Sequence, residues 1–241
     1  MTNISETESF ARANFPLQAG FDPAVVKAFK SAYRKLSARL NIEKGKQILD
    51  LGCGRGLVIE ALHDISGWLT GFDFSHEFLT CAKKRNSSVK FIQGDMEAIP
   101  LLDEKFDVIL AITSIEFTKN REKTLAEINR VLKKNGLCYF EFRNEDFFLP
   151  RLLSNFIREF LVKFGVLAPI KQKDFTDLKY SEWKNLIQKA GFYILSEFPS
   201  LRPWNYGNLL TKLKNLCIEI CKYILPLSKQ YMVSFSCEKR A

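Results

Sequence analysis

The sequence has few cysteines and histidines, and it lacks long uncharged apolar runs. Six cysteines occur among 241 residues, at spacings that match neither a disulfide framework nor a zinc site, and only two histidines are present. No stretch approaches the roughly 18 uncharged apolar residues of a membrane-spanning helix. The N-terminal sequence MTNISETESFARANF has the character of neither a signal peptide nor a basic transit sequence. We therefore expect no metal site, reduced cysteines and a soluble, cytoplasmic protein.

Acidic residues are scarce only in the last part of the chain. The whole sequence has 36 Lys and Arg against 27 Asp and Glu, a net charge of +9. Residues 1–150 contain 21 basic and 20 acidic side chains, whereas residues 151–241 contain 15 and 7. The excess positive charge therefore belongs to the C-terminal part, which points to an anionic partner such as a nucleic acid or a membrane surface.

Helices and strands are predicted to alternate through the first 144 residues. Residues 22–40 have apolar side chains at three- and four-residue steps, which predicts a helix with Asp22 as its N-cap and Pro23 in its first turn. Strands are then predicted at 47–52, 67–75, 89–95, 106–114 and 137–144, and helices at 56–66, 76–85 and 121–136. This alternation is typical of parallel βαβ units and a doubly wound sheet.

The alternation stops after Asn144. A helix at 180–192 and strands at 192–200 and 231–240 are expected, separated by two helical patterns with apolar stripes at 149–165 and 206–225. Each stripe could cover the sheet or could cap a substrate site. We divide the chain into an N-terminal helical segment (1–41), a core (42–144) and a C-terminal part of the same domain (145–241). The last part would contain insertions at about 145–175 and 200–230.

The chemically informative stretch is ILDLGCGRG at residues 48–56. A predicted strand runs into a glycine-rich turn that opens a helix, and glycines at 52 and 54 allow the backbone to approach a ligand closely. The dinucleotide pattern G-x-G-x-x-G is absent, because counting from Gly52 places Leu57 at its third position. Asp50 would repel a pyrophosphate but could pair with an amino-acid ammonium, directly or through water. The turn therefore disfavours NAD and leaves cofactors with a cationic aminocarboxypropyl tail.

Two further acidic residues end predicted strands. Asp73 ends the second strand, where a carboxylate can accept both hydroxyls of a ribose. Asp95 follows the third strand, where it could accept from an adenine amino group while Met96 packs on the ring. Since the carboxyl ends of parallel strands share one edge of the sheet, these residues and the glycine turn should lie together.

These motifs resemble the class I S-adenosylmethionine (SAM)-dependent methyltransferases, of the group that includes the ubiquinone/menaquinone enzymes (methyltransferase type 11). The resemblance rests on ILDLGCGRG, GFDFS, FIQGDMEAIPLLDEKFDVILAITSIEF and LAEINRVLKKNGLCYFEF, and WKNLIQKAGFYIL and MVSFSCEK match the family's closing helix and strands. It implies a Rossmann-like α/β fold whose seven strands have the order 3-2-1-4-5-7-6, with the last strand antiparallel. It also implies SAM as cofactor, contacted by Asp50, Gly52, Cys53, Gly54, Asp73, Phe74, Asp95, Met96 and Ile112.

The sequence names no clear catalytic residue. His76 and Glu116 are the candidates, although we interpret His76 as a helix-start residue and Glu116 as a structural contact. Cys53 is interpreted as a small residue that the turn requires. No Asn/Asp-Pro-Pro-Tyr sequence follows the fourth strand, which disfavours methylation of adenine or of glutamine amides.

The resemblance therefore predicts an enzyme that methylates an O, C or N atom of a hydrophobic or amphiphilic small molecule, forming S-adenosylhomocysteine (SAH). Two alternatives stay open: methylation of RNA or protein, suggested by the basic C-terminal part, and a non-catalytic SAM-binding regulator or scaffold. Basic residues beside apolar stripes favour an anionic amphiphile, or peripheral contact with a membrane, over nucleic acid.

Overall fold

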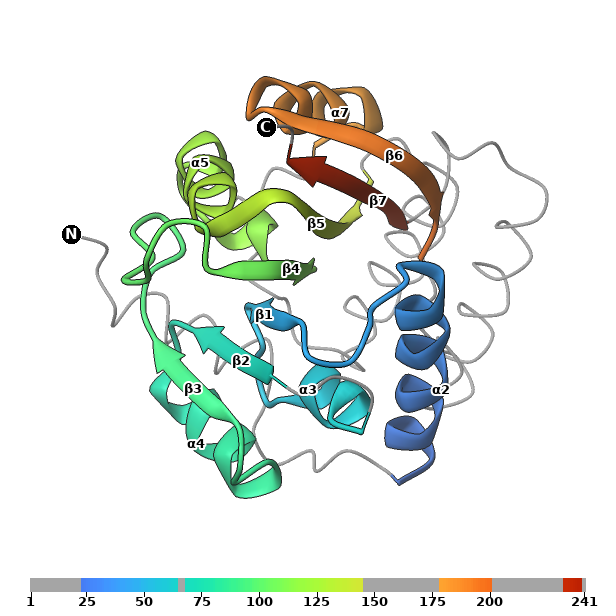
Figure 1. Ribbon diagram of the computed structural model, residues 1–241, viewed down its shortest axis with the longest axis vertical. Coiled ribbons are helices and arrows are strands. Elements are labelled where there is room, and N and C mark those ends of the chain that lie inside the picture. Colours follow the sequence, from blue (N-terminus) through green and yellow to red (C-terminus); the bar gives the residue numbers. More distant parts are fainter. Residues whose placement is uncertain (1–22, 65–67, 145–177, 201–231, 240–241) are drawn as a thin grey trace, which may run out of the picture.

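The computed structural model describes residues 23–64, 68–144, 178–200 and 232–239 (Figure 1). Its centre is a single seven-stranded sheet with the order β3-β2-β1-β4-β5-β7-β6. The strands β1 to β5 are parallel to one another, and β7 runs antiparallel to both β5 and β6. The strands are β1 (Gln47–Leu51), β2 (Trp68–Asp73), β3 (Lys90–Gln93), β4 (Phe106–Ile112), β5 (Leu132–Arg143), β6 (Phe192–Pro199) and β7 (Met232–Lys239). The fold and strand order implied by the resemblance are confirmed.

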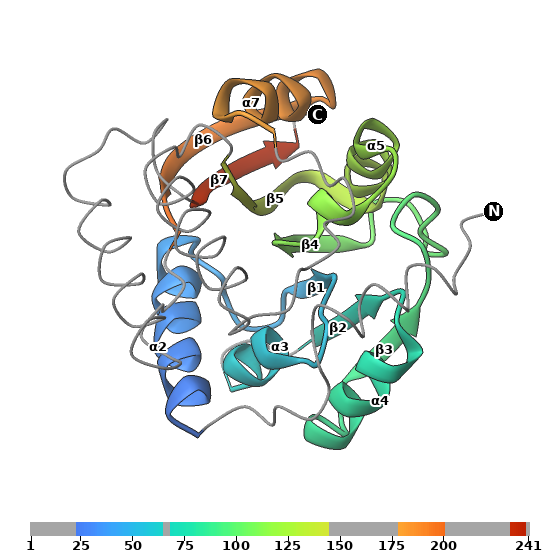
Figure 2. The same ribbon diagram turned by 180° about the vertical axis from the view of Figure 1, so that it is seen from behind.

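Helices cover both faces of this sheet (Figures 1 and 2). One face packs against α2 (Pro23–Arg39), α3 (Leu57–Leu62) and α4 (His76–Arg85), and the other against α5 (Arg121–Val131) and α7 (Tyr180–Lys189). The central strands are therefore buried on both sides, which explains why β4 is nearly continuous apolar sequence. Side-chain caps fix two of the helix starts: Ser75 accepts from the N–H of Phe78, and Asn120 accepts from that of Lys123.

Cross-strand pairing places specific side chains on the face covered by α2 and α3. Asp50 of β1 pairs with Leu110 of β4, which in turn pairs with Tyr139 of β5. The next row toward the carboxyl edge contains Ile112, Glu141, Ser234 and Phe198. Paired residues point to the same side of a sheet, so both rows lie beneath α2 and α3.

The end of β5 and the start of β7 are direct neighbours, because Arg143 pairs with Met232. The stretch from Asn144 to residue 231 therefore connects two neighbouring positions of the sheet. Within that stretch the structure describes α7 and β6.

The sequence predicted most elements to within a few residues, with one clear error. The predicted helix 121–136 ends at Val131, and β5 begins at Leu132 rather than at residue 137. Leu132 pairs with Phe106 of β4, and a register irregularity follows before Val108 pairs with Leu137. The 56–66 helix ends at Leu62, so it too is shorter than predicted.

Several predictions lie outside the described residues. These are the Asp22 cap and the two apolar stripes at 149–165 and 206–225. The division of the chain at residues 41 and 144 stays a prediction. Among the helices that the structure describes, none combines the length and the hydropathy needed to cross a bilayer.

Candidate functional site

The glycine turn is held against the end of β2. The N–H groups of Gly52 and Cys53 both donate to the carbonyl of Phe72, at 2.8 and 3.0 Å. Gly52 has φ +80°, and a Cβ there would lie 2.3 Å from the Cβ of Ser114 and 2.9 Å from the Cε of Met96. Gly54 also has positive φ, but a Cβ there would meet no atom within 4 Å. The turn thus needs glycine at position 52 for packing and has open space at position 54.

Asp73 is fixed by the same turn. Its Oδ2 accepts from the N–H of Gly54 at 2.8 Å, and its Oδ1 accepts from the N–H of Ser75 at 2.9 Å. Burial raises the pKa of Asp73 to about 6, although backbone hydrogen bonds from Ser75, Gly54 and Phe74 lower it. Each carboxylate oxygen keeps a second lone pair, so the group can still accept from a ligand hydroxyl.

Asp50 is the most unusual group at this edge. It is buried at the end of β1, and its Oδ2 has no hydrogen-bond partner among the described residues. Burial, and secondarily the nearby Asp73, raise the pKa of Asp50 to about 8. A buried carboxyl with an unsatisfied oxygen is costly unless a ligand completes it, and a cation would do so best.

Cys53 is buried beside these two carboxyls. Burial, and then the charges of Asp50 and Asp73, raise the pKa of the Cys53 thiol well above its usual value. The thiol is therefore protonated at neutral pH, which is unfavourable for a nucleophile. This agrees with its interpretation as a small residue in the turn.

The loop after β3 brings Asp95 and Met96 to the glycine turn. Met96 is buried with its Cε against Gly52, and Asp95 is half-buried and accepts from the N–H of Glu97. Glu97 in turn accepts from the N–H groups of Lys119 and Asn120, both at 2.8 Å.

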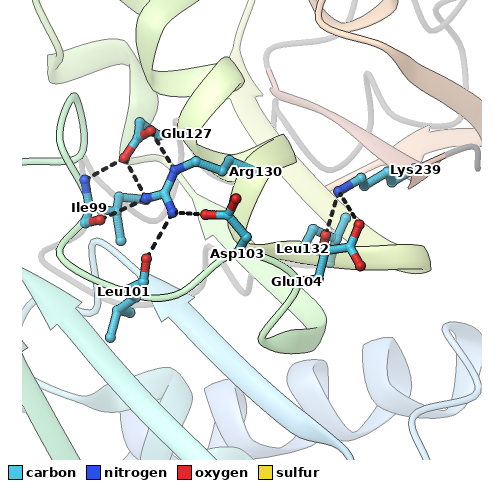
Figure 3. Close-up of polar contacts among 8 residues, drawn as sticks. All are labelled: Ile99, Leu101, Asp103, Glu104, Glu127, Arg130, Leu132 and Lys239. Carbon is cyan, nitrogen blue, oxygen red and sulfur yellow. Dashed lines mark hydrogen bonds and ion pairs between the residues drawn. The ribbon is translucent and has the colours of Figure 1, made fainter.

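The far end of this loop is held by Arg130 of α5 (Figure 3). The guanidinium donates to the carbonyls of Ile99 and Leu101, both at 2.8 Å, and pairs with Glu127 and Asp103. Glu127 completes the arrangement by accepting from the N–H of Ile99 at 2.7 Å. The loop that contains Asp95 and Met96 is therefore hydrogen-bonded to α5 through its later residues, from Ile99 to Asp103.

The two catalytic candidates differ in their surroundings. Glu116 lies in a 3-10 turn, η1 (Ile115–Phe117), where it is buried and its Oε1 accepts from the N–H of Arg143 at 3.1 Å. His76 is exposed in the first turn of α4. The structure places Phe74 half-buried after β2 and Ile112 buried at the end of β4. The roles assigned to these four residues stay predictions.

Sequence reasoning missed two buried polar groups at the same edge. Ser114 follows β4, and its Oγ has no hydrogen-bond partner among the described residues. Glu141 lies within β5, and its Oε1 is likewise unpartnered in the part of the chain that the structure describes. A lone acid in the aromatic strand CYFEF was the only signal for Glu141.

The site fits the cofactor that the fold implies. Asp50 offers a buried acceptor to the ammonium of SAM, Asp73 offers acceptors to its ribose, and Gly54 leaves open space beside the turn. Among the described residues, no group of three His, Cys, Asp or Glu side chains could hold a metal ion.

Comparisons with known proteins find relatives among methyltransferases. A family model described as "Methyltransferase domain" matches residues 49–140. A malonyl-[acyl-carrier protein] O-methyltransferase of Buchnera aphidicola is 33% identical over 93 residues, which cover 39% of this chain and 38% of the relative. A phthiotriol/phenolphthiotriol dimycocerosates methyltransferase of Mycobacterium tuberculosis is 31% identical over 135 residues, covering 54% and 47%. The chain thus matches less than half the length of these relatives.

Solved structures share the fold at low identity. A chain of the structure described as a "Complex between the Haloferax volcanii Trm112 methyltransferase activator and the putative methyltransferase" superposes with a TM-score of 0.67 at 17% identity, over 98% of this chain and 97% of that one. The [4+2]-cyclase SpnF superposes with a TM-score of 0.61 at 17% identity, over 88% and 81%. These likenesses concern the fold alone. Together with the family match, they show that residues 49–140 of this chain form a methyltransferase domain, on the sheet that the resemblance to class I S-adenosylmethionine-dependent enzymes implied.

Proposed function

We propose that this protein transfers a methyl group from SAM to an O, C or N atom of a hydrophobic or amphiphilic small molecule. The proposal rests on the buried carboxyl of Asp50 at the glycine turn, whose Oδ2 has no hydrogen-bond partner among the described residues. Asp73 lies near this carboxyl, and Met96 packs against Gly52 of the same turn. When bound, SAM supplies an activated methyl group on a positively charged sulfur.

The residues of the chain would act by binding and alignment. Asp50 would hold the ammonium of the cofactor and Asp73 its ribose, and Met96 would pack beside its adenine. Alignment of two bound reactants alone can lower a barrier by ~7–11 kcal/mol. A proton-abstracting residue is therefore not required for every acceptor.

The small-molecule acceptor is supported by the relatives. Those named above are described as acting on a malonyl group on an acyl carrier protein and on phthiotriol dimycocerosates. The basic and apolar composition of residues 151–241 suits an amphiphile of this general kind.

The test is calorimetric titration of the full chain with SAM, followed by incubation with methyl-labelled SAM and fractionated lipid and small-metabolite extracts. We expect SAM to bind, Asp73→Ala to weaken it, and label to enter an organic-soluble product. If Asp73→Ala binds SAM as well as the wild type, the cofactor assignment fails. If SAM binds but no extract yields SAH, the non-catalytic alternative replaces the proposal.

We also propose that the basic C-terminal part makes peripheral contact with an anionic membrane surface. The support is the confinement of the charge excess to residues 151–241, next to two apolar helical patterns.

A further inference from the structure

The buried carboxyl of Glu141 lies outside the cofactor site and is held in one orientation by hydroxyl groups. Its Oε2 accepts from the hydroxyl of Tyr139 at 2.9 Å and from that of Ser200 at 2.7 Å. Ser234 of β7 lies 2.9 Å from the Tyr139 hydroxyl and completes the group. Burial, and then the nearby Glu141, raise the pKa of Tyr139, so its hydroxyl stays protonated as a donor.

Both hydrogen bonds that the carboxyl of Glu141 accepts go to Oε2. The other oxygen, Oε1, is inaccessible to solvent and has no partner within the described ranges. A buried carboxylate oxygen without a donor is unfavourable, so a group that donates to it would be bound strongly. The same reasoning assigns the unsatisfied oxygen of Asp50 to the cofactor.

Glu141 is the direct cross-strand neighbour of the residue predicted to contact the methionine part of SAM. Glu141 pairs directly with Ile112 across the β4–β5 ladder, and both side chains point to the face that contains Asp50. Neighbouring strands are about 4.8 Å apart. Ile112 is the residue predicted to contact the methionine part of SAM, so Glu141 lies one strand further along the edge, beyond the cofactor.

We infer that Glu141 binds the methyl acceptor by accepting a hydrogen bond from a neutral O–H or N–H group through Oε1. This inference rests on the proposed function and narrows it. The acceptor would present a neutral donor such as a phenol, alcohol or amine, and a carboxylate would be repelled by Glu141. The chain would then differ in its acceptor from an enzyme that methylates a free malonyl carboxylate.

The test measures binding of four small probes to the full chain saturated with SAH. Two have a neutral donor, 4-butylphenol and 4-butylaniline; two lack one at pH 8, 4-butylanisole and 4-butylbenzoate. By calorimetry, at least one donor probe should bind about tenfold or more tightly than both probes without a donor. Failure of SAH to bind would overturn the proposed function. If SAH binds but no probe does, or if the anisole or benzoate binds as well as the donors, only the Glu141 inference is overturned.

Two variants separate binding from stability. In Glu141→Gln, the amide oxygen should face the hydroxyls of Tyr139 and Ser200, which places the NH₂ group where Oε1 was. The preference for donor probes should then disappear, while SAH affinity stays unchanged. Tyr139→Phe removes one hydrogen bond to Oε2 but leaves Oε1 available, so it should keep the preference. If Glu141→Gln keeps the preference, or if both variants lose it equally, the side chain has only a structural role.

Discussion

The two carboxyls at the glycine turn make the stability of the ligand-free protein fall as the pH rises. The pKa of Asp50 is about 8 and that of Asp73 about 6 in the folded state, both above the unfolded value of 3.8. A raised pKa means that the folded state retains protons which the unfolded state has lost. The contribution of these two groups to stability is therefore fully present below about pH 4 and is lost toward pH 8.

Between pH 6 and 8 most of this fall belongs to Asp50, because Asp73 is already half ionised at pH 6. We expect the free energy of unfolding to drop by about 1.4 kcal/mol per pH unit in this window, measured by urea denaturation. Asp50→Asn should flatten the slope. Asp107→Asn is the control, because hydrogen bonds from Gln47 and Lys133 keep the pKa of Asp107 low and it does not titrate in this window. A wild-type stability that is level or rises from pH 6 to 8 would contradict the prediction.

Cofactor binding should release a proton from the same group. If the ammonium of SAM pairs with Asp50, the carboxyl must ionise on binding at any pH below about 8, where the ligand-free group is protonated. Titrations at pH 7 in two buffers with different ionisation enthalpies should reveal this release. SAM affinity should rise from pH 6 to 8, by up to about tenfold per unit. Equal heats in the two buffers would show that Asp50 does not pair with the cofactor.

The two glycines at the turn should respond differently to a methyl group. Gly52→Ala would place a Cβ against Ser114 and Met96, so we expect the free energy of unfolding to fall by about 3 kcal/mol. Gly54→Ala meets no protein atom and should lose only the ~1–2 kcal/mol of a left-handed non-glycine residue.

Gly54→Ala should nevertheless bind SAM far more weakly, because its methyl group enters the space left for the cofactor. Thermal denaturation and calorimetry measure the two effects separately. Unchanged SAM affinity in Gly54→Ala would mean that the cofactor does not approach this part of the turn.

For single residues, the sequence predicted the position in the fold of those that belong to local motifs. Asp50, Gly52 and Asp73 lie at strand ends that can be located from hydrophobic runs and glycines. Glu141 could not be recognised in this way, because its hydroxyl partners are remote in sequence: Ser200 is 59 positions away, and Ser234 is 95 positions from Tyr139. Only the pairing of β5 with β7 brings them together.

At the level of helices and loops, the hydrogen bonds between α5 and the loop after β3 should stabilise the fold and support cofactor binding. Arg130→Ala would leave the carbonyls of Ile99 and Leu101 without this donor, and Glu127 would keep only the hydrogen bond from the N–H of Ile99. We expect a loss of ~2–4 kcal/mol and weaker SAM binding, because this loop contains Asp95 and Met96. Urea denaturation and calorimetry at a temperature where the variant is folded would measure both.

Lys133→Ala is the matched control. Lys133 makes a half-exposed ion pair with Asp107, so its removal should cost less than ~1 kcal/mol and leave SAM binding unchanged. Equal losses in the two variants would show that Arg130 has no special role at the loop.

The boundary between α5 and β5 shows where sequence patterns fail. The segment VLKKNG continues the helical spacing of apolar residues, so sequence alone places it in the helix. In the structure Leu132 pairs with Phe106, and the Glu104 and Lys105 N–H groups bond to the carbonyls of Arg130 and Val131. Contacts with a different strand and loop therefore end the helix early.

For the whole molecule, the charge distribution predicts binding to anionic membranes. The full chain should sediment with vesicles that contain phosphatidylglycerol at low salt and should be released at about 0.5 M salt, where screening is strong. Vesicles of phosphatidylcholine alone are the control. If the chain binds duplex RNA with a steep salt dependence but no vesicles, the RNA alternative becomes the better explanation of the charge.

The pairing of Arg143 with Met232 has a consequence for how this protein could diversify. Residues 144–231 connect two positions that are paired side by side, and the entropic cost of closing such a connection grows only with the logarithm of its length. Segments of it outside α7 and β6 can therefore be lengthened, shortened or exchanged at little cost to the pairing of β1–β5. Under the proposed function, acceptor recognition by this stretch would change separately, while the residues that bind SAM would be inherited intact.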